Sequence, residues 1–238
     1  MSRLWEKGLP LDERVLRYTA GEDHQLDARL VPYDVHGSIA HAEMLAEQDL
    51  ISAADCTAIR DGLTALGKSF EMGDWCISLE DEDAHTALES RLTDAIGPVG
   101  GRLHLGRSRN DQVLTALRMY LRDASNDLVS CVNQLRESIS NLQDRQGDIE
   151  LPGYTHMQHA MPSSVALWCG GFDEGFADAA EGLMSLRKRI NKNPLGSAAG
   201  YGTPGLPLDR DATTAKLDFD ITQNPVTAAQ LSRGKAES

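Results

Sequence analysis

Residues 106–112 read Gly-Arg-Ser-Arg-Asn-Asp-Gln and place two guanidinium groups beside a hydroxyl and three further hydrogen-bonding side chains. Arginine presents five donors in a fixed fork that suits carboxylates. A run with helical periodicity follows directly, and a helix N-terminus adds free backbone N–H groups and partial positive charge. The stretch therefore predicts a site for a small anion, and we interpret that anion as a carboxylate.

The same stretch also fits an ordinary capped helix start. Ser108 is a favoured N-cap residue, and Asp111 three positions later resembles a capping box with Asp in place of Glu. The two interpretations are compatible, because a capped helix start can also hold an anion. Taken alone, the stretch does not decide between them.

A second candidate for chemistry is the pair Thr155 and His156, in a polar segment bracketed by Pro152 and Pro162. Histidine has the unperturbed pKa nearest to neutral, so it suits proton transfer. A lone histidine is more often structural or simply exposed. A loop histidine with polar neighbours is a better candidate, but one sequence does not establish that this segment meets residues 106–112.

Acidic residues crowd the opening of a third predicted helix, which begins at Glu80. Such residues suit a helix N-terminus, and His85 and Glu89 share a helix face at i and i+4. We interpret the group as a solvated acidic cap with an ordinary surface pair. A metal held by Asp81, Asp83, His85 and Glu89 is the less favoured alternative, because nothing fixes a ligand geometry.

Helical periodicity predicts the elements that would position these residues. The predicted helices cover residues 22–47, 52–66, 80–96, 108–145, 165–190, 211–217 and a last segment from 226. The helix over 108–145 has apolar residues at steps of three and four and would be about 55 Å long. That length predicts a long bundle, or packing with other chains.

Glycines and prolines give further local predictions. Pro32 lies in a first helical turn or makes a kink, and Gly67 ends the second helix. The glycines within 165–190 suggest close helix contacts. The Gly/Pro-rich loop over 193–209 either lets backbone N–H groups reach a ligand or simply connects helices, and a short hairpin is the one strand pattern considered, near 198–207.

Composition excludes several classes of function. The net charge of −13 argues against nucleic acid or an anionic membrane surface as partner, and 41% hydrophobic residues with only 5% aromatics indicate an aliphatic, helical core. The four cysteines form no CxxC pair, and no apolar run approaches a membrane span. We expect a cytoplasmic protein with reduced thiols.

Together, the motifs closely resemble the argininosuccinate lyase family, part of the wider fumarase/aspartase superfamily. The double-arginine stretch discriminates, because relatives acting on fumarate or aspartate share the Thr-His loop but not this stretch. The matching segments follow the family's order and are residues 33–42, 82–85 with Glu89, 106–112, 153–158 and 194–197.

The resemblance implies an all-α fold, with a small N-terminal helical domain, residues 1–106, followed by a long-helix bundle domain, residues 107–238. It also implies a homotetramer with a twenty-helix core, in which each active site gathers loops from three subunits. The implied reaction is the reversible elimination of argininosuccinate to arginine and fumarate, in arginine biosynthesis. The family uses no metal and no organic cofactor.

The resemblance also implies roles for particular residues. Ser108, Arg109 and Asn110 would contact the substrate, with Arg109 suited to the fumarate-side carboxylate. Thr155 would hydrogen-bond a carboxylate, and His156 would be the proton-transfer partner. A sixth residue, His85, matches a family histidine near the substrate.

Two departures from the family pattern bear on activity. The family's N-terminal Gly-Gly-Arg-Phe run is replaced by Glu-Lys-Gly-Leu at residues 6–9. A third family loop, Gly-Ser-Ser-x-Met-Pro-x-Lys-x-Asn-Pro, carries the presumed base and does not occur among the 238 residues. We therefore expect a truncated chain that is inactive by itself. The alternative is a non-catalytic crystallin-like or scaffold protein that keeps carboxylate binding.

Overall fold

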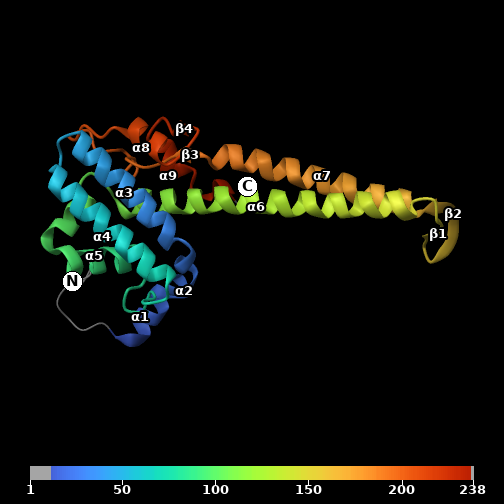
Figure 1. Ribbon diagram of the computed structural model, residues 1–238, viewed down its shortest axis with the longest axis horizontal. Coiled ribbons are helices and arrows are strands. Elements are labelled where there is room, and N and C mark those ends of the chain that lie inside the picture. The colour runs from blue at the N-terminus through green and yellow to red at the C-terminus, as the bar shows by residue number, and fades with distance from the viewer. Residues whose placement is uncertain (1–11, 237–238) are drawn as a thin grey trace. The chain divides into compact units, whose positions relative to one another are not determined.

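The computed structural model describes residues 12–236, so the departure at residues 6–9 lies outside the described part (Figure 1). Within the described part, helices account for most of the chain and the strands are short, which confirms the predicted all-α fold. The chain divides into two compact units: Met1–Tyr120 with Asn191–Ser238, and Leu121–Ile190. We call these the first and the second unit.

The first unit holds most of the helices. Its elements are α1 (Glu13–Ala20), α2 (Asp23–Leu26), η1 (Asp27–Arg29), α3 (Val31–Glu47), α4 (Ala53–Glu71), α5 (Ala84–Ile96), η2 (Gly97–His104), the first turns of α6 (Arg109–Gln146), β3 (Lys192–Asn193), α8 (Arg210–Lys216), β4 (Ile221–Thr222), α9 (Thr227–Leu231) and η3 (Arg233–Ala236).

Helices α3, α4 and α5 pack against one another and enclose the core of the first unit. The spacing explains why: Ile59 and Leu63 lie at i and i+4 on α4, and Leu88 and Leu92 do so on α5. All four side chains are buried. Burying such aliphatic side chains contributes about 2 kcal/mol each, so this layer anchors the helix that carries Asp83, His85 and Glu89.

Several helix ends follow the predictions, while others differ. Ser52 caps α4 with a complete capping box to Asp55, and Pro32 lies in the first turn of α3. The predicted stop at Gly67 is wrong, because α4 continues to Glu71. A Cβ on Gly67 would lie 3.5 Å from a methyl group of Val35, so this glycine lies at the packed α3–α4 interface.

Two other predicted elements are replaced. The expected helix over 22–47 is broken into α2, η1 and α3, after an unpredicted α1 that begins at an Asp12 cap. The hairpin near 198–207 is absent from the described chain, and β3 instead pairs with β4 in parallel. A short parallel pair of this kind depends on tertiary contact, so no local pattern predicts it.

The second unit consists of the rest of α6, a hairpin of β1 (Glu150–Thr155) and β2 (Gln158–Ser164), and α7 (Val165–Ile190) (Figure 1). Both long helices lie within two residues of their predicted ends. The close contacts expected at the α7 glycines are not found: a Cβ on Gly170, Gly171, Gly175 or Gly182 would meet nothing within 4 Å. Leu128, Leu135, Trp168 and Phe172 are 43–56% exposed.

The predicted division into domains 1–106 and 107–238 stays a prediction. The two compact units of the structure divide α6 between Tyr120 and Leu121. Among the residues that the structure describes, no helix is both long enough and apolar enough to cross a membrane.

Candidate functional site

The arginine-rich stretch forms the start of α6, as predicted. Gly106 turns the chain with a positive φ of 69°, a conformation that favours glycine. Ser108 precedes the helix, and its backbone N–H donates to Asp111 Oδ1 at 2.9 Å. Its hydroxyl accepts from the N–H of Asn110 at 3.3 Å. One of the two hydrogen bonds of the predicted capping box is therefore present, the one from the Ser108 N–H to the Asp111 carboxylate. The other differs, because the Ser108 hydroxyl accepts from the N–H of Asn110 and not from that of Asp111.

The second carboxylate oxygen of Asp111 is the acceptor for backbone N–H groups of the Gly/Pro-rich loop over residues 193–209. It accepts backbone N–H groups of Gly196 at 2.9 Å and Ala198 at 2.8 Å. Asp111 is fully buried, and burial raises its pKa even though backbone N–H donors and Arg107 act in the opposite direction. The two loop N–H groups thus hold a carboxylate of the chain itself and tie residues 194–198 to the start of α6.

Arg109 points to α5. Its Nη1 donates to both carboxylate oxygens of Asp83, at 3.1 and 3.3 Å, and to the hydroxyl of Thr86 at 2.6 Å. Its Nη2 donates to Glu89 Oε2 at 3.2 Å. The side chain is 29% exposed. The guanidinium is therefore already paired with two carboxylates of the chain.

Glu89 bridges the side chains of His104 and Arg109. Its Oε1 lies 2.5 Å from His104 Nε2, and its Oε2 accepts from Arg109. Burial would raise the pKa of Glu89, but the hydrogen bond and charge of His104 and the charge of Arg109 bring it below its ordinary value. The interpretation of Glu89 as a member of a solvated surface pair with His85 is wrong, because the two side chains have different partners and neither is exposed.

His85 belongs to a buried polar cluster. Its Nδ1 lies 2.8 Å from Asp34 Oδ2, and both side chains are 1% exposed. Gln112 donates to both oxygens of Asp34 at 2.8 and 3.0 Å. Burial would raise the pKa of Asp34, but the charges of His85 and Arg107 and these hydrogen bonds lower it to about 2. Burial likewise opposes protonation of His85, yet Asp34 raises its pKa, so the pair is ionic.

Arg107 extends this cluster, since its Nη1 donates to Ser38 at 2.8 Å and Ser38 in turn donates to Asp34 at 3.3 Å. On the same helix as Ser38, the fully buried His41 meets the carbonyl of Leu105 through Nε2 at 2.9 Å. Burial and the nearby charge of Arg107 lower the pKa of His41 to about 3, so this histidine is neutral.

Asn110 faces away from the α5 contacts of its neighbour. Its side-chain oxygen accepts from Arg233 Nη1 at 2.9 Å, in a contact exposed to solvent. Asn110 and Ser108 are each half-buried, so both present polar atoms at the surface of the helix start. A small anion approaching this end of α6 would meet these two residues.

The four residues considered as metal ligands have other partners. Asp81 pairs with Arg91, Asp83 and Glu89 hold Arg109, and His85 holds Asp34. No group of three potential metal ligands occurs among the described residues. The absence of a metal from the function stays a prediction.

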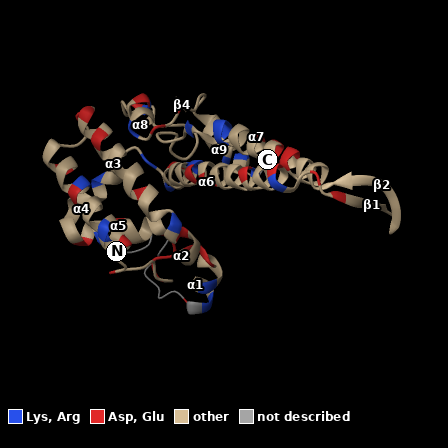
Figure 2. Cartoon of the chain, turned by 45° about the vertical axis from the view of Figure 1, so that its right-hand side comes forward, with Lys and Arg blue, Asp and Glu red and all other residues tan. Residues whose placement is uncertain are grey.

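Thr155 and His156 lie in the second unit, where the predicted polar loop is a β-hairpin. His156 and Met157 form its two-residue turn, with φ of 49° and 61°. Positive φ at both positions is typical of a type I′ turn, whose twist matches that of paired strands. Both Thr155 and His156 are exposed. In Figure 2 the hairpin is almost free of charged colour, and its sequence contains one such residue, Glu150.

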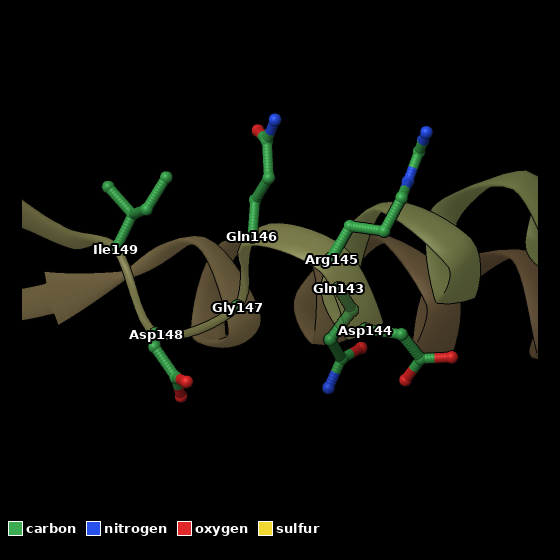
Figure 3. A pocket seen from close by; sticks show the side chains of 7 residues that line it. All are labelled: Gln143, Asp144, Arg145, Gln146, Gly147, Asp148 and Ile149. Atoms are coloured by element: carbon green, nitrogen blue, oxygen red, sulfur yellow. The ribbon is translucent and has the colours of Figure 1, made fainter.

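The second unit also contains a cavity of about 230 Å³ at the end of α6, lined by residues 143–149. Figure 3 shows the side chains of Arg145 and Gln146 on one side of the chain and those of Asp144 and Asp148 on the other. These side chains do not converge on one point, so the cavity is a poor candidate for a ligand site.

Sequence reasoning did not identify four residues of the polar network around the start of α6, namely Asp34, Gln112, His104 and Ser38. Gln112 and Asp34 lie in the two segments singled out by the family resemblance, so the motif marked them without indicating a role. Their signal is tertiary: Asp34 and Gln112 are 78 residues apart and meet only when α3 and α6 pack.

Comparisons with known proteins agree with this picture. The family described as Lyase matches residues 13–234. An argininosuccinate lyase of Sorangium cellulosum is 42% identical over 237 residues, which cover 99% of this chain and 55% of that protein. An argininosuccinate lyase of Thermotoga neapolitana is 39% identical over 99% of this chain and 59% of that protein. The chain spans about half the length of the curated relatives it matches.

Among solved structures, a variant of EDDS lyase with bound fumarate is similar with a TM-score of 0.77 and 29% sequence identity. The match covers 94% of this chain and 44% of that chain. This likeness supports the helical architecture over nearly the whole sequence. The family match and the curated relatives confirm the resemblance found in the motifs.

Proposed function

The chain belongs to the lyase family, and from that membership we propose that it forms part of an argininosuccinate lyase. The reaction is the elimination of argininosuccinate to arginine and fumarate. A carbon–nitrogen bond breaks, and a proton leaves the carbon next to a carboxylate. Negative charge therefore grows on that carboxylate, and preorganised donors stabilise it.

The observation that carries the proposal is the start of α6. The stretch that discriminates argininosuccinate lyases from their relatives forms a helix N-terminus with Ser108 and Asn110 half-buried at its surface. Free N–H groups at a helix N-terminus favour a carboxylate there. We assign substrate contact to Ser108 and Asn110, with Arg109 in the same site.

Thr155 and His156 supply the second part of the proposed chemistry. Their exposure on a hairpin turn suits residues that act on a ligand outside their own unit. We propose that Thr155 donates a hydrogen bond to a carboxylate and that His156 takes part in proton transfer. His85 is buried against Asp34, so we assign it an electrostatic role from beneath the site and no direct contact with the substrate.

We also propose that the whole protein is a homotetramer with a role in arginine biosynthesis. The support is the exposed apolar surface of the second unit, which would be covered by helices of other copies. A cytoplasmic location and the absence of a cofactor stay predictions.

The test is an assay of fumarate release from argininosuccinate, measured by ultraviolet absorbance. We expect the 238-residue chain alone to release none, because the loop that carries the presumed base is not in its sequence. We expect the longest reading frame that contains the chain to be active, and Asn110→Ala and His156→Asn to abolish that activity. If that longer protein binds argininosuccinate without turnover, the crystallin-like alternative is correct.

A further inference from the structure

We propose that Arg109 is a positioning residue, which clasps the first turn of α6 to α5 and thereby presents Ser108 and Asn110. The inference rests on the proposed function, because it reassigns one residue of the same site. The motif alone suggests that the Arg109 guanidinium binds the ligand's carboxylate. The contacts point to a different role.

The first argument is the number of internal partners. Arg109 donates to Asp83, Thr86 and Glu89, at distances from 2.6 to 3.3 Å. These partners all belong to α5 or to its N-cap. Two carboxylates already balance the charge of this arginine, so an incoming carboxylate would have to displace them and would repel them as well.

The second argument is that the partners are themselves held in place. Asp83 caps α5 by accepting the backbone N–H of Thr86 at 2.6 Å and its hydroxyl at 2.8 Å. Glu89 is held on its other oxygen by His104, 2.5 Å away in η2. A guanidinium gripped from two sides by fixed carboxylates loses little further freedom, as its planar fork is suited to such contacts.

The third argument is helix geometry. Successive residues of an α-helix are about 100° apart around the axis, since 3.6 residues complete a turn. With Arg109 directed at α5, its neighbours Ser108 and Asn110 must face other directions. The observed partner of Asn110 is Arg233 and not any residue of α5. Fixing Arg109 therefore fixes the direction in which the Asn110 amide is presented.

The experiment uses the 238-residue chain without ligand, so its result is independent of whether the chain binds argininosuccinate. Variants Arg109→Gln, Glu89→Gln and the double variant are compared by urea unfolding and by the NMR signals of the Asn110 side-chain amide. We expect both single variants to lower the unfolding midpoint, and the double variant to match Arg109→Gln instead of adding the two losses. We also expect both to shift the Asn110 amide signals under native conditions.

The matched control is Arg91→Gln. Arg91 lies on α5, forms an ion pair with Asp81 and is 28% exposed, close to the 29% of Arg109 on α6. This variant should lower the midpoint but leave the Asn110 amide signals in place. Arg109→Lys should restore the midpoint only in part, because one ammonium cannot replace the fork that reaches both Asp83 and Glu89.

The proposal is overturned if Arg109→Gln leaves both the midpoint and the Asn110 signals unchanged, as expected for a ligand anchor that contributes nothing to the folded chain. It is also overturned if Arg91→Gln shifts the Asn110 signals equally, since the effect would then be general loosening. Either result leaves the proposed function standing, and inactivity of the longer protein would leave the clasp standing.

Discussion

The charged side chains at and around the start of α6 are paired with other groups of the same chain. Asp34 holds His85, Glu89 holds His104 and Arg109, and Asp111 holds two backbone N–H groups of the 194–198 loop. Each contact joins residues far apart in the sequence. The site is therefore built on ionic pairs whose loss should affect folding as well as function.

Replacing Asp34 with Asn tests the buried pair. His85 would lose the carboxylate that raises its pKa, so burial would favour the neutral imidazole and the buried pair would be lost. We expect a loss of about 3 kcal/mol in the free energy of unfolding. Urea unfolding near neutral pH measures it. Asp61→Asn is the control, because the Asp61 side chain is 65% exposed and, among the described residues, forms an ion pair with its neighbour Arg60. Equal losses in the two variants would contradict the buried ion pair.

His41 predicts an acid-sensitive stability. Its folded pKa is lowered to about 3, so between about pH 6.5 and 3 the unfolded chain binds a proton that the folded chain does not. Stability therefore falls as pH falls through this window, by up to about 1.4 kcal/mol per pH unit for one proton.

The variant His41→Gln should flatten this dependence by one proton, as measured by urea unfolding at several pH values. His85 contributes in the opposite sense, because its raised pKa stabilises the fold below the unfolded value and that stability is lost as pH rises through the folded pKa. The comparison of the two curves removes this common contribution. Parallel curves for the wild type and His41→Gln would show that His41 is not buried and neutral.

At the scale of elements, the glycines differ in whether another part of the chain lies close to their backbone. Gly153 lies at the irregular point of the β1–β2 pairing, and a Cβ there would be 2.3 Å from the carbonyl oxygen of Met161. The same construction at Gly175 in α7 meets nothing within 4 Å. One glycine is thus required by geometry, whereas the other is not required within this chain.

Gly153→Ala should therefore disrupt the hairpin that carries His156. We expect a loss of about 2 kcal/mol in local stability, because the methyl group and the Met161 carbonyl cannot both keep their places. Amide hydrogen exchange of β1 and β2 measures it. Gly175→Ala is the matched change in the same unit and should stabilise α7 by about 1 kcal/mol. Unchanged exchange in Gly153→Ala would mean that the strands pair differently.

At the scale of the molecule, the second unit has little interior of its own. Among its described residues, those that are buried are Ser125, Cys169, Ala180 and Ile190. The apolar stripe of α6, predicted to pack in a long bundle or with other chains, includes Leu128 and Leu135 at 53% and 43% exposure. Apolar surface of this extent fits the proposed packing against other copies of the chain.

We predict that the isolated chain associates, and that Leu135→Gln combined with Phe172→Gln reduces the association. Removing two large apolar groups from the exposed helices lowers the gain from burying them. Size-exclusion chromatography over a range of concentrations checks this. The control is Tyr18→Gln with Met72→Gln, which removes two apolar side chains that are 89% and 71% exposed in the first unit. A monomer at every concentration in the wild-type chain would contradict the prediction.

Local chemistry was enough to predict the long helices and the Ser52 and Ser108 caps, because periodicity and capping act within a few residues. The anion site at residues 106–112 stays a prediction. Local chemistry failed for the hairpin at residues 150–164, whose turn carries His156 and Met157 in place of the usual Asn and Gly. It also failed for β3 and β4, which pair across 29 residues.

The partners of the motif residues depended on packing between distant segments. Asp34 and His85 are 51 residues apart, and Gly196 lies 85 residues from Asp111. Charge pairing inside a protein is set by which helices meet, and no spacing within one helix encodes it. The motif therefore indicated an arginine for a ligand, while the folded chain shows that arginine holding two of its own carboxylates.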